Sequence, residues 1–240
     1  MEEFLLLAYH ERTNMADSKL KDFEQVIGYT FKNINLLRLA LTHSSYGNEA
    51  YHNKFHNNER LKFLGDAVLE ITVSDYIFEK YDNQPEGELT KLRASIVCEP
   101  TLALCARDIN LGSMLYLGKG EEMTGGRFRD SITSDAFEAV IGAIYKDGGI
   151  ECARAFVREH VLNDIDQKKL FVDSKSILQE KIQEFSPDGP EYVLISETGP
   201  DHCKEFRVKV CAEGKELARG VGKTKKAAEQ QAAYNAILKM

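Results

Sequence analysis

Residues 58–69 read NERLKFLGDAVL, and the spacing of their apolar residues predicts an amphipathic helix. Three charged residues, Glu59, Lys62 and Asp66, fall on one face of that helix because they are three and four positions apart. Two kinds of site fit a lysine between two acids. One is a helix surface with ordinary salt bridges, and the other is a metal site in which one ligand has been replaced.

The patterns on either side of this stretch divide the chain into two parts. Helical spacing dominates from 20 to 163, and no strand pattern competes with it. After the polar connector NDIDQKK the chain changes to a helix at 174–185, three alternating stretches (EYVLIS, KEFRVKVC and LARGVG) and a closing helix at 224–238. We therefore predict an all-α domain followed by a small α+β domain of order α-β-β-β-α. The predicted boundaries are an N-terminal extension at 1–16, the all-α domain at 17–165, a linker at 166–172 and the small domain at 173–240.

Composition predicts a soluble, globular protein of the reducing cytoplasm. The 5 cysteines are odd in number and form no CxxC pair, so neither a disulfide framework nor a zinc knuckle is indicated. No apolar run approaches the ~18 residues that a membrane span needs. The short FLLLA segment follows Glu2 and Glu3 instead of the basic start of a signal peptide, so we expect no membrane partner.

Charge is distributed unevenly along the chain. The net charge of −7 argues against nucleic-acid binding by the protein as a whole. Residues 173–240, however, contain 11 Lys+Arg and 11 Asp+Glu, so residues 1–172 carry the whole deficit. The small domain can therefore bind nucleic acid if its basic groups lie on one face.

Acidic residues recur inside helical segments that are otherwise apolar. Asp135 and Glu138 in SDAFEAVIGA share a helix face, and the small residues Ala139, Gly142 and Ala143 would let another helix approach closely. Converging carboxylates raise each other's pKa unless a divalent cation neutralises them, and hard oxygen ligands suit Mg²⁺. The alternative is that these acids form ordinary ion pairs on helix surfaces.

Several segments resemble the ribonuclease III family of endonucleases that cut double-stranded RNA. In the order expected for the family, these are LTHSSY at 41–46, NERLKFLGDAVL, PEGELTKLRA at 85–94 and SDAFEAVIGAIYKDGG at 134–149. Residues 173–240 resemble a double-stranded RNA-binding domain. Such a run of ordered motifs favours the metal-site interpretation of the acids.

The resemblance implies a homodimer of helical nuclease domains that forms a valley for the RNA duplex. In this sequence Asp66, Asp135 and Glu138 match metal-ligand positions, with Asp66 and Glu138 also catalytic. The implied cofactor is Mg²⁺, with Mn²⁺ as an alternative, and the implied reaction is metal-assisted hydrolysis by in-line attack of water. Glu59 and Glu86 match acids that line the valley. The implied role is the processing of ribosomal RNA, messenger RNA and other structured precursors.

Two positions beside these acids leave a choice of roles. Lys62 stands where the family has a glutamate ligand, so an ammonium occupies a place that a dication needs. Lys62 could also turn away and pair with Glu59, which would still leave the site one carboxylate short. We expect weak metal binding and poor cleavage, as the result of either engineered inactivation or natural divergence. Phe63 matches a dimer contact in the family, although its spacing fits a core aromatic of its own domain equally well.

The small domain is expected to bind the duplex at separated points. Double-stranded RNA is recognised largely by shape over roughly 16 bp. Lysines at the start of the last predicted helix are suited to phosphates, because the helix N-terminus already favours anions. By resemblance, the RNA-binding residues are Gln179, Glu180, His202, Lys223, Lys225 and Lys226. The GKT in GVGKTKK lacks the earlier glycine of a P-loop, so we expect no nucleotide cofactor.

Two classes of function remain open on the sequence. The first is an endoribonuclease that cuts double-stranded RNA, with its activity impaired by Lys62. The second is a catalytically inactive protein that binds double-stranded RNA.

Overall fold

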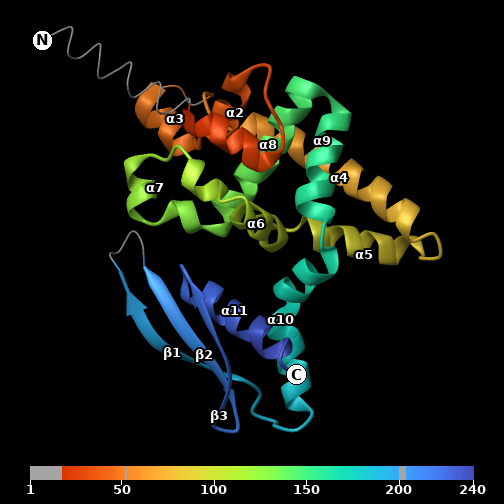
Figure 1. The fold of residues 1–240 in the computed structure, drawn as a ribbon, viewed down its shortest axis with the longest axis vertical. Helices are drawn as coiled ribbons and strands as arrows, with labels where there is room; N and C mark the ends of the chain where they lie inside the picture. The colour runs from red at the N-terminus through yellow and green to blue at the C-terminus, as the bar shows by residue number, and fades with distance from the viewer. Residues whose placement is uncertain (1–17, 52, 54, 200–203) are drawn as a thin grey trace, which may run out of the picture. The chain divides into compact units, whose positions relative to one another are not determined.

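The structure is a computed structural model that describes residues 18–51, 53, 55–199 and 204–240 (Figure 1). The chain divides into two compact units. The first contains Met1–Lys119 and Asp130–Asn163, and the second contains Gly120–Arg129 and Asp164–Met240. The extension predicted at 1–16 lies outside the described residues.

The first unit is all helical in its described part, as the sequence predicts. A helix at 18–27 is followed by helices of different lengths, of which α4 and α8 are the longest. The elements between residues 34 and 162 are α2 (Ile34–Ala40), α3 (Ser44–Tyr51), α4 (Glu59–Lys80), α5 (Glu86–Val97), α6 (Glu99–Asp108), a 3₁₀ turn (Leu111–Met114), α7 (Lys119–Met123), a second 3₁₀ turn (Gly126–Phe128), α8 (Asp130–Gly148), α9 (Ile150–Val157) and a π-helical turn (Arg158–Leu162). Of these, α7 beyond Lys119 and the second 3₁₀ turn belong to the second unit.

Two glycines set the close packing of α4 against α8. A Cβ at Gly65 would collide with the carbonyl oxygen of Glu138, and a Cβ at Gly142 would collide with the carbonyl oxygen of Leu61. The backbones of the two helices therefore touch at this crossing. The expectation that the small residues Ala139, Gly142 and Ala143 admit a second helix is confirmed at Gly142, and Gly65 is its counterpart on α4. Fully buried side chains, including Leu69 and Phe137, fill the core on either side.

Buried asparagine fixes the start of α4. The backbone N–H of Asn58 donates to the carbonyl of Thr42 at 2.8 Å, and its side-chain Nδ2 donates to the carbonyl of Ala40 at 3.2 Å. Asn57 accepts from the N–H of Glu59 at 3.1 Å. The first turn of α4 is thus attached to the end of α2. This attachment fixes the start of the helix and therefore the positions of Lys62 and Asp66 along it.

The second unit contains the predicted α-β-β-β-α domain. Its sheet is an antiparallel meander in the order β1-β2-β3, in which Tyr192 pairs with Val210 and Val210 with Ala218. Leu178 and Ile182 of the first helix pack on the same side as these residues and complete the core. The elements are α10 (Ile165–Gln183), β1 (Glu191–Thr198), β2 (Glu205–Ala212), β3 (Lys215–Gly222) and α11 (Lys225–Ile237).

Helix α10 includes the residues for which the sequence predicts a linker. Positions 166–172 are helical and continue without interruption into the small domain. Gln230 of α11 donates from Nε2 to the carbonyls of Phe171 and Val172, the latter at 2.7 Å. Ser174 also donates to the carbonyl of Phe171 at 2.8 Å, and the Phe171 ring lies 5.3 Å from that of Tyr234. The second half of 166–172 is therefore attached to α11.

Candidate active site and nucleic-acid interface

The α4–α8 crossing brings four charged side chains of the two helices together. Lys62 and Asp66 lie on either side of Gly65 on α4, and Asp135 and Glu138 lie on α8 at the same crossing. The charges of Asp66, Asp135 and Glu138 all act on Lys62, and those of Lys62, Asp66 and Asp135 act on Glu138, so we treat the four groups as one cluster. This cluster, which we call the acid cluster, contains three carboxylates and one ammonium.

An ion pair joins the two helices within the acid cluster. Lys62 Nζ lies 2.7 Å from Asp135 Oδ1. The alternative considered from the sequence, a pair between Lys62 and Glu59, is not the one found. The two paired side chains are 41% and 45% exposed, so water screens their attraction. A pair of this kind contributes about 0–1 kcal/mol to stability.

Lys62 remains a cation at neutral pH. Burial alone lowers its pKa, but the hydrogen bond to Asp135 and the charges of Asp135, Glu138 and Asp66 raise it, and the net effect is a raised pKa. The acid cluster therefore contains a fixed positive charge that its own chain supplies.

Glu138 is the carboxyl group most affected by its surroundings. Burial and the nearby charge of Asp66 raise its pKa to about 7, with a smaller contribution from Asp135, and the Lys62 ammonium opposes this rise. A carboxyl group with such a pKa can exchange a proton near neutral pH.

The described residues do not match the three-carboxylate metal site expected from the sequence. In the part of the chain that the structure describes, no group of three or more His, Cys, Asp and Glu side chains is placed to hold a metal ion. Asp135 is engaged by Lys62, and the ammonium lies where a dication would have to neutralise the carboxylates. With Lys62 in this position, the residues present do not fit the implied Mg²⁺.

The two acids expected to line a valley lie outside the acid cluster. Glu59 is exposed in the first turn of α4, and Glu86 is exposed in the first turn of α5, where it accepts a hydrogen bond from Thr90 at 2.9 Å. Neither contributes to the shifted pKa of Lys62 or Glu138. Their solvent-facing positions leave them accessible to a ligand.

An exposed apolar stripe runs along α4. Phe63 is 79% exposed, which excludes the alternative that it is a core aromatic of its own domain. Ile71 and Phe78 are 54% and 72% exposed, and their spacing places them with Phe63 and Ala67 on one side of the helix. Large apolar side chains aligned in this way indicate a surface that another protein covers.

The basic segment of the small domain lies at a helix N-terminus. Lys223, Lys225 and Lys226 are exposed, and Thr224 between them caps α11 by accepting from the N–H of Ala227 at 3.1 Å. The cap and the helix dipole give this end a partial positive charge, to which the lysines add. Two further predicted contacts, Gln179 and Glu180, are exposed on α10, and His202 lies outside the described residues.

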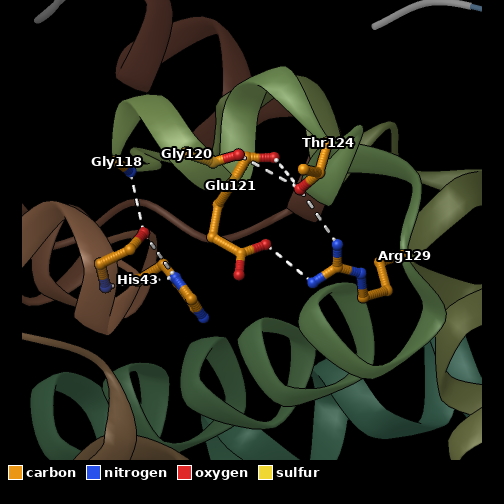
Figure 2. A network of polar contacts seen from close by, with 7 residues as sticks. His43, Gly118, Gly120, Glu121, Thr124 and Arg129 are labelled. Carbon is orange, nitrogen blue, oxygen red and sulfur yellow. Dashed lines mark hydrogen bonds and ion pairs between the residues drawn. The ribbon is translucent and has the colours of Figure 1, made fainter. Parts of the chain in front are cut away.

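The LTHSSY segment contains a polar network that the sequence did not predict (Figure 2). Ser45 Oγ accepts from the N–H of Gly118 at 2.8 Å and lies 2.8 Å from Nδ1 of His43. The side chain of Glu49 accepts from the N–H of Lys119 at 3.0 Å. These contacts attach the chain before residue 120 to α3, which gives the motif a structural role.

Ion pairs within residues 120–129 stabilise the conformation of this segment. Arg129 pairs with Glu121 at 2.8 Å and donates to Thr124 at 3.2 Å, as Figure 2 shows. Arg127 pairs with Glu122 at 2.6 Å. Both arginines therefore have acidic partners within the same segment, a pairing that only the folded loop brings about.

Comparison with known proteins supports both halves of this description. A family model described as Ribonuclease-III-like matches residues 33–165, and one described as double-stranded RNA binding motif matches residues 174–240. A helical nuclease domain joined to a double-stranded RNA-binding domain defines an RNA-directed class of protein.

The relatives specify the family. A protein named Ribonuclease 3 from Bacillus cytotoxicus is 50% identical over 220 residues, covering 91% of this chain and 90% of its own. A Bacillus cereus protein of the same name is 50% identical over 222 residues, covering 92% and 91%. The nuclease domain of ribonuclease III from Campylobacter jejuni is 43% identical, with a TM-score of 0.56, and covers 60% of this chain and 96% of its own. The chain belongs to the ribonuclease III family of endoribonucleases.

Proposed function

We propose that this protein binds double-stranded RNA through its C-terminal domain and cleaves it weakly at the acid cluster. The observation that carries the proposal is the 2.7 Å ion pair between Lys62 and Asp135, in a chain that belongs to a family of RNA endonucleases. In this ion pair Lys62 engages Asp135, a carboxylate that we assign to the reaction. It also adds a positive charge that repels a dication.

The acids have separate roles in this proposal. Asp66 and Glu138 are the catalytic groups, and Asp66, Asp135 and Glu138 are the residues that would hold Mg²⁺ or Mn²⁺. Such an ion, if bound there, would supply an activated water and would neutralise charge on the phosphate. Because the residues present do not fit the ion while Lys62 engages Asp135, the native chain binds it weakly. Glu59 and Glu86, both exposed, lie along the RNA path.

The RNA-binding surface is assigned to three segments of the small domain. Lys223, Lys225 and Lys226 at the start of α11 bind phosphates, and Gln179 and Glu180 on α10 bind 2′-hydroxyls. His202, between β1 and β2, enters a minor groove. Recognition by shape makes the surface suitable for structured precursors such as ribosomal and messenger RNA in the cytoplasm. No nucleotide cofactor is involved.

The apolar stripe on α4 is assigned to a homodimer contact. Phe63 lies at its start and is the most exposed of its large side chains. The Campylobacter jejuni relative is described as having a region involved in dimer formation within its nuclease domain. A symmetric contact through one exposed stripe would bury the same side chains on both copies.

A second candidate is a double-stranded RNA-binding protein that does not cleave. It is favoured by the same ion pair, which engages Asp135 and leaves Asp66 and Glu138 as the remaining carboxylates of the acid cluster. Such a protein would protect or present its RNA.

One experiment separates these functions. The full chain and Lys62→Glu are compared in cleavage of a labelled long RNA duplex with Mg²⁺, beside a gel shift of the same duplex in Ca²⁺. We expect equal binding, weak cleavage by the native chain and at least tenfold faster cleavage by the variant. Binding without any cleavage by the native chain supports the second candidate. Failure of Lys62→Glu to gain activity, with binding and dimerisation intact, contradicts the assigned cause.

A further inference from the structure

The close backbone contact between α4 and α8 keeps the carboxylates of the acid cluster near one another. Asp66 lies next to Gly65, and the carbonyl of Glu138 lies directly against that glycine. Because the helices touch at this point, the acids of α4 and α8 are held near one another whatever their charge. Like charges held together destabilise a fold unless a cation accompanies them or one of them takes up a proton.

Lys62 is the cation that the structure provides. Its ammonium reaches from α4 to Asp135 on α8, and the charges that act on it include Glu138 and Asp66 as well. One side chain therefore interacts with all three carboxylates. Its stem starts one helical turn before Asp66, so the ammonium reaches α8 beside the crossing.

We propose that Lys62 is the resident counter-ion of the acid cluster and makes the folded nuclease unit independent of divalent metal. It neutralises part of the carboxylate charge and joins the two helices, which are tasks that a bound dication would otherwise perform. The proposal rests on the assignment of these acids under Proposed function, and it concerns the stability of the unit instead of its chemistry.

The proposal distinguishes the charge of Lys62 from its bulk. Replacement by methionine retains an unbranched apolar stem and removes only the ammonium, whereas glutamate reverses the charge. A matched control is Lys91→Glu, because Lys91 also pairs with an acid, Glu88, at 2.9 Å on an exposed helix surface but lies outside the acid cluster.

The test is thermal unfolding of the full-length protein followed by circular dichroism, in EDTA and in a MgCl₂ or CaCl₂ titration. The native protein is expected to unfold at the same temperature in all conditions. Lys62→Glu is expected to unfold about 2–4 °C lower in EDTA and to recover as the divalent ion is added. Lys62→Met should show a smaller loss, and Lys91→Glu should show no dependence on the ion.

A second readout is direct binding of Mn²⁺, followed by the electron paramagnetic resonance signal of the free ion. Lys62→Glu is expected to reduce the signal much more than the native chain, which binds the ion only weakly. A native unfolding temperature that rises with Mg²⁺ as much as that of the glutamate variant would overturn the proposal. So would equal stability of native, methionine and glutamate forms in EDTA. Neither readout uses cleavage, so weak or strong nuclease activity of the native chain bears on the proposed function alone.

Discussion

Gly65 on α4 lies against the carbonyl oxygen of Glu138 on α8, so closely that a Cβ on Gly65 would overlap it. Because glycine has no side chain, the two backbones come into contact here. This contact determines the distance between the charged residues of the two helices. The geometry of the acid cluster depends on it as much as on the acids themselves.

Gly65→Ala should therefore destabilise the nuclease unit by about 1–3 kcal/mol or more, because α4 and α8 must move apart to admit the methyl group. Denaturant unfolding measures the loss. The matched control is Gly87→Ala in α5, where an added Cβ meets nothing within 4 Å and should be neutral or slightly stabilising. Equal changes in the free energy of unfolding for the two substitutions would show that the close α4–α8 crossing does not make Gly65 necessary for stability.

Replacing Lys223, Lys225 and Lys226 together with alanine should weaken binding to duplexes of any sequence. Each lost phosphate contact should also reduce the slope of log affinity against log salt by about 1, because fewer counterions are released. Binding titrations at several salt concentrations measure both effects. A variant with alanine at Lys209, Lys215 and Lys239 has the same change in charge, and we expect it to retain most of the affinity.

Phe63→Ala should weaken self-association without unfolding the monomer, because its side chain is 79% exposed in the isolated chain. A buried aromatic at the centre of an interface contributes at least about 1–2 kcal/mol, so the dimer dissociation constant should rise about tenfold or more. Sedimentation measures the constant. Phe185→Ala, an exposed position in the second unit, should leave it unchanged. A monomeric native protein at micromolar concentration would contradict the homodimer.

The free energy of unfolding should fall as the pH rises from about 4.5 to about 7, because of Glu138. Its pKa in the folded protein is raised to about 7 from an ordinary value of 4.5, chiefly by burial and by Asp66. The folded state thus holds the proton over this range while the unfolded state releases it, and the stabilisation is lost as the pH rises through the folded pKa. Glu138→Gln removes this ionisation. The difference in unfolding free energy between native and variant should therefore change across this interval and be constant below it.

Gln230→Ala should speed amide hydrogen exchange at 170–174, because the carbonyls of Phe171 and Val172 lose a donor from α11. Exchange followed by mass spectrometry on the full chain measures the change. The neighbouring Gln231 bonds to Asn235 within its own helix, so Gln231→Ala is the control and should leave this segment protected. Identical exchange rates at 170–174 in the two variants would rule out the attachment of this segment to α11 through Gln230.

Periodic patterns in the sequence predicted most of the fold. The three alternating stretches became β1, β2 and β3, and SDAFEAVIGA became the face of α8 that receives α4. These features are predictable because local spacing determines which face of a helix or strand is apolar. The small residues Ala139, Gly142 and Ala143 also indicated the close approach, since small side chains on an apolar helix face leave room for the backbone of a second helix.

The details that the sequence missed depend on contacts between distant residues. The partner of Lys62 is Asp135, 73 positions away, whereas local spacing offered Glu59. Gln230, far along the chain, binds the carbonyls of Phe171 and Val172 within the helical segment 166–172, whereas the local sequence NDIDQKK at 163–169 is polar and charged and predicted a linker. Neither contact leaves a periodic signal in one sequence.

The continuity of α10 has a mechanical consequence. Because 166–172 is helical and its second half is attached to α11, this part of the segment belongs to the packed structure of the RNA-binding domain. Each residue in an α-helix turns the chain by about 100° and advances it by about 1.5 Å. A residue added between Val172 and Leu178 would therefore turn the Phe171 and Val172 carbonyls by about 100° relative to the core side chains Leu178 and Ile182, so that Gln230 could no longer bind both carbonyls.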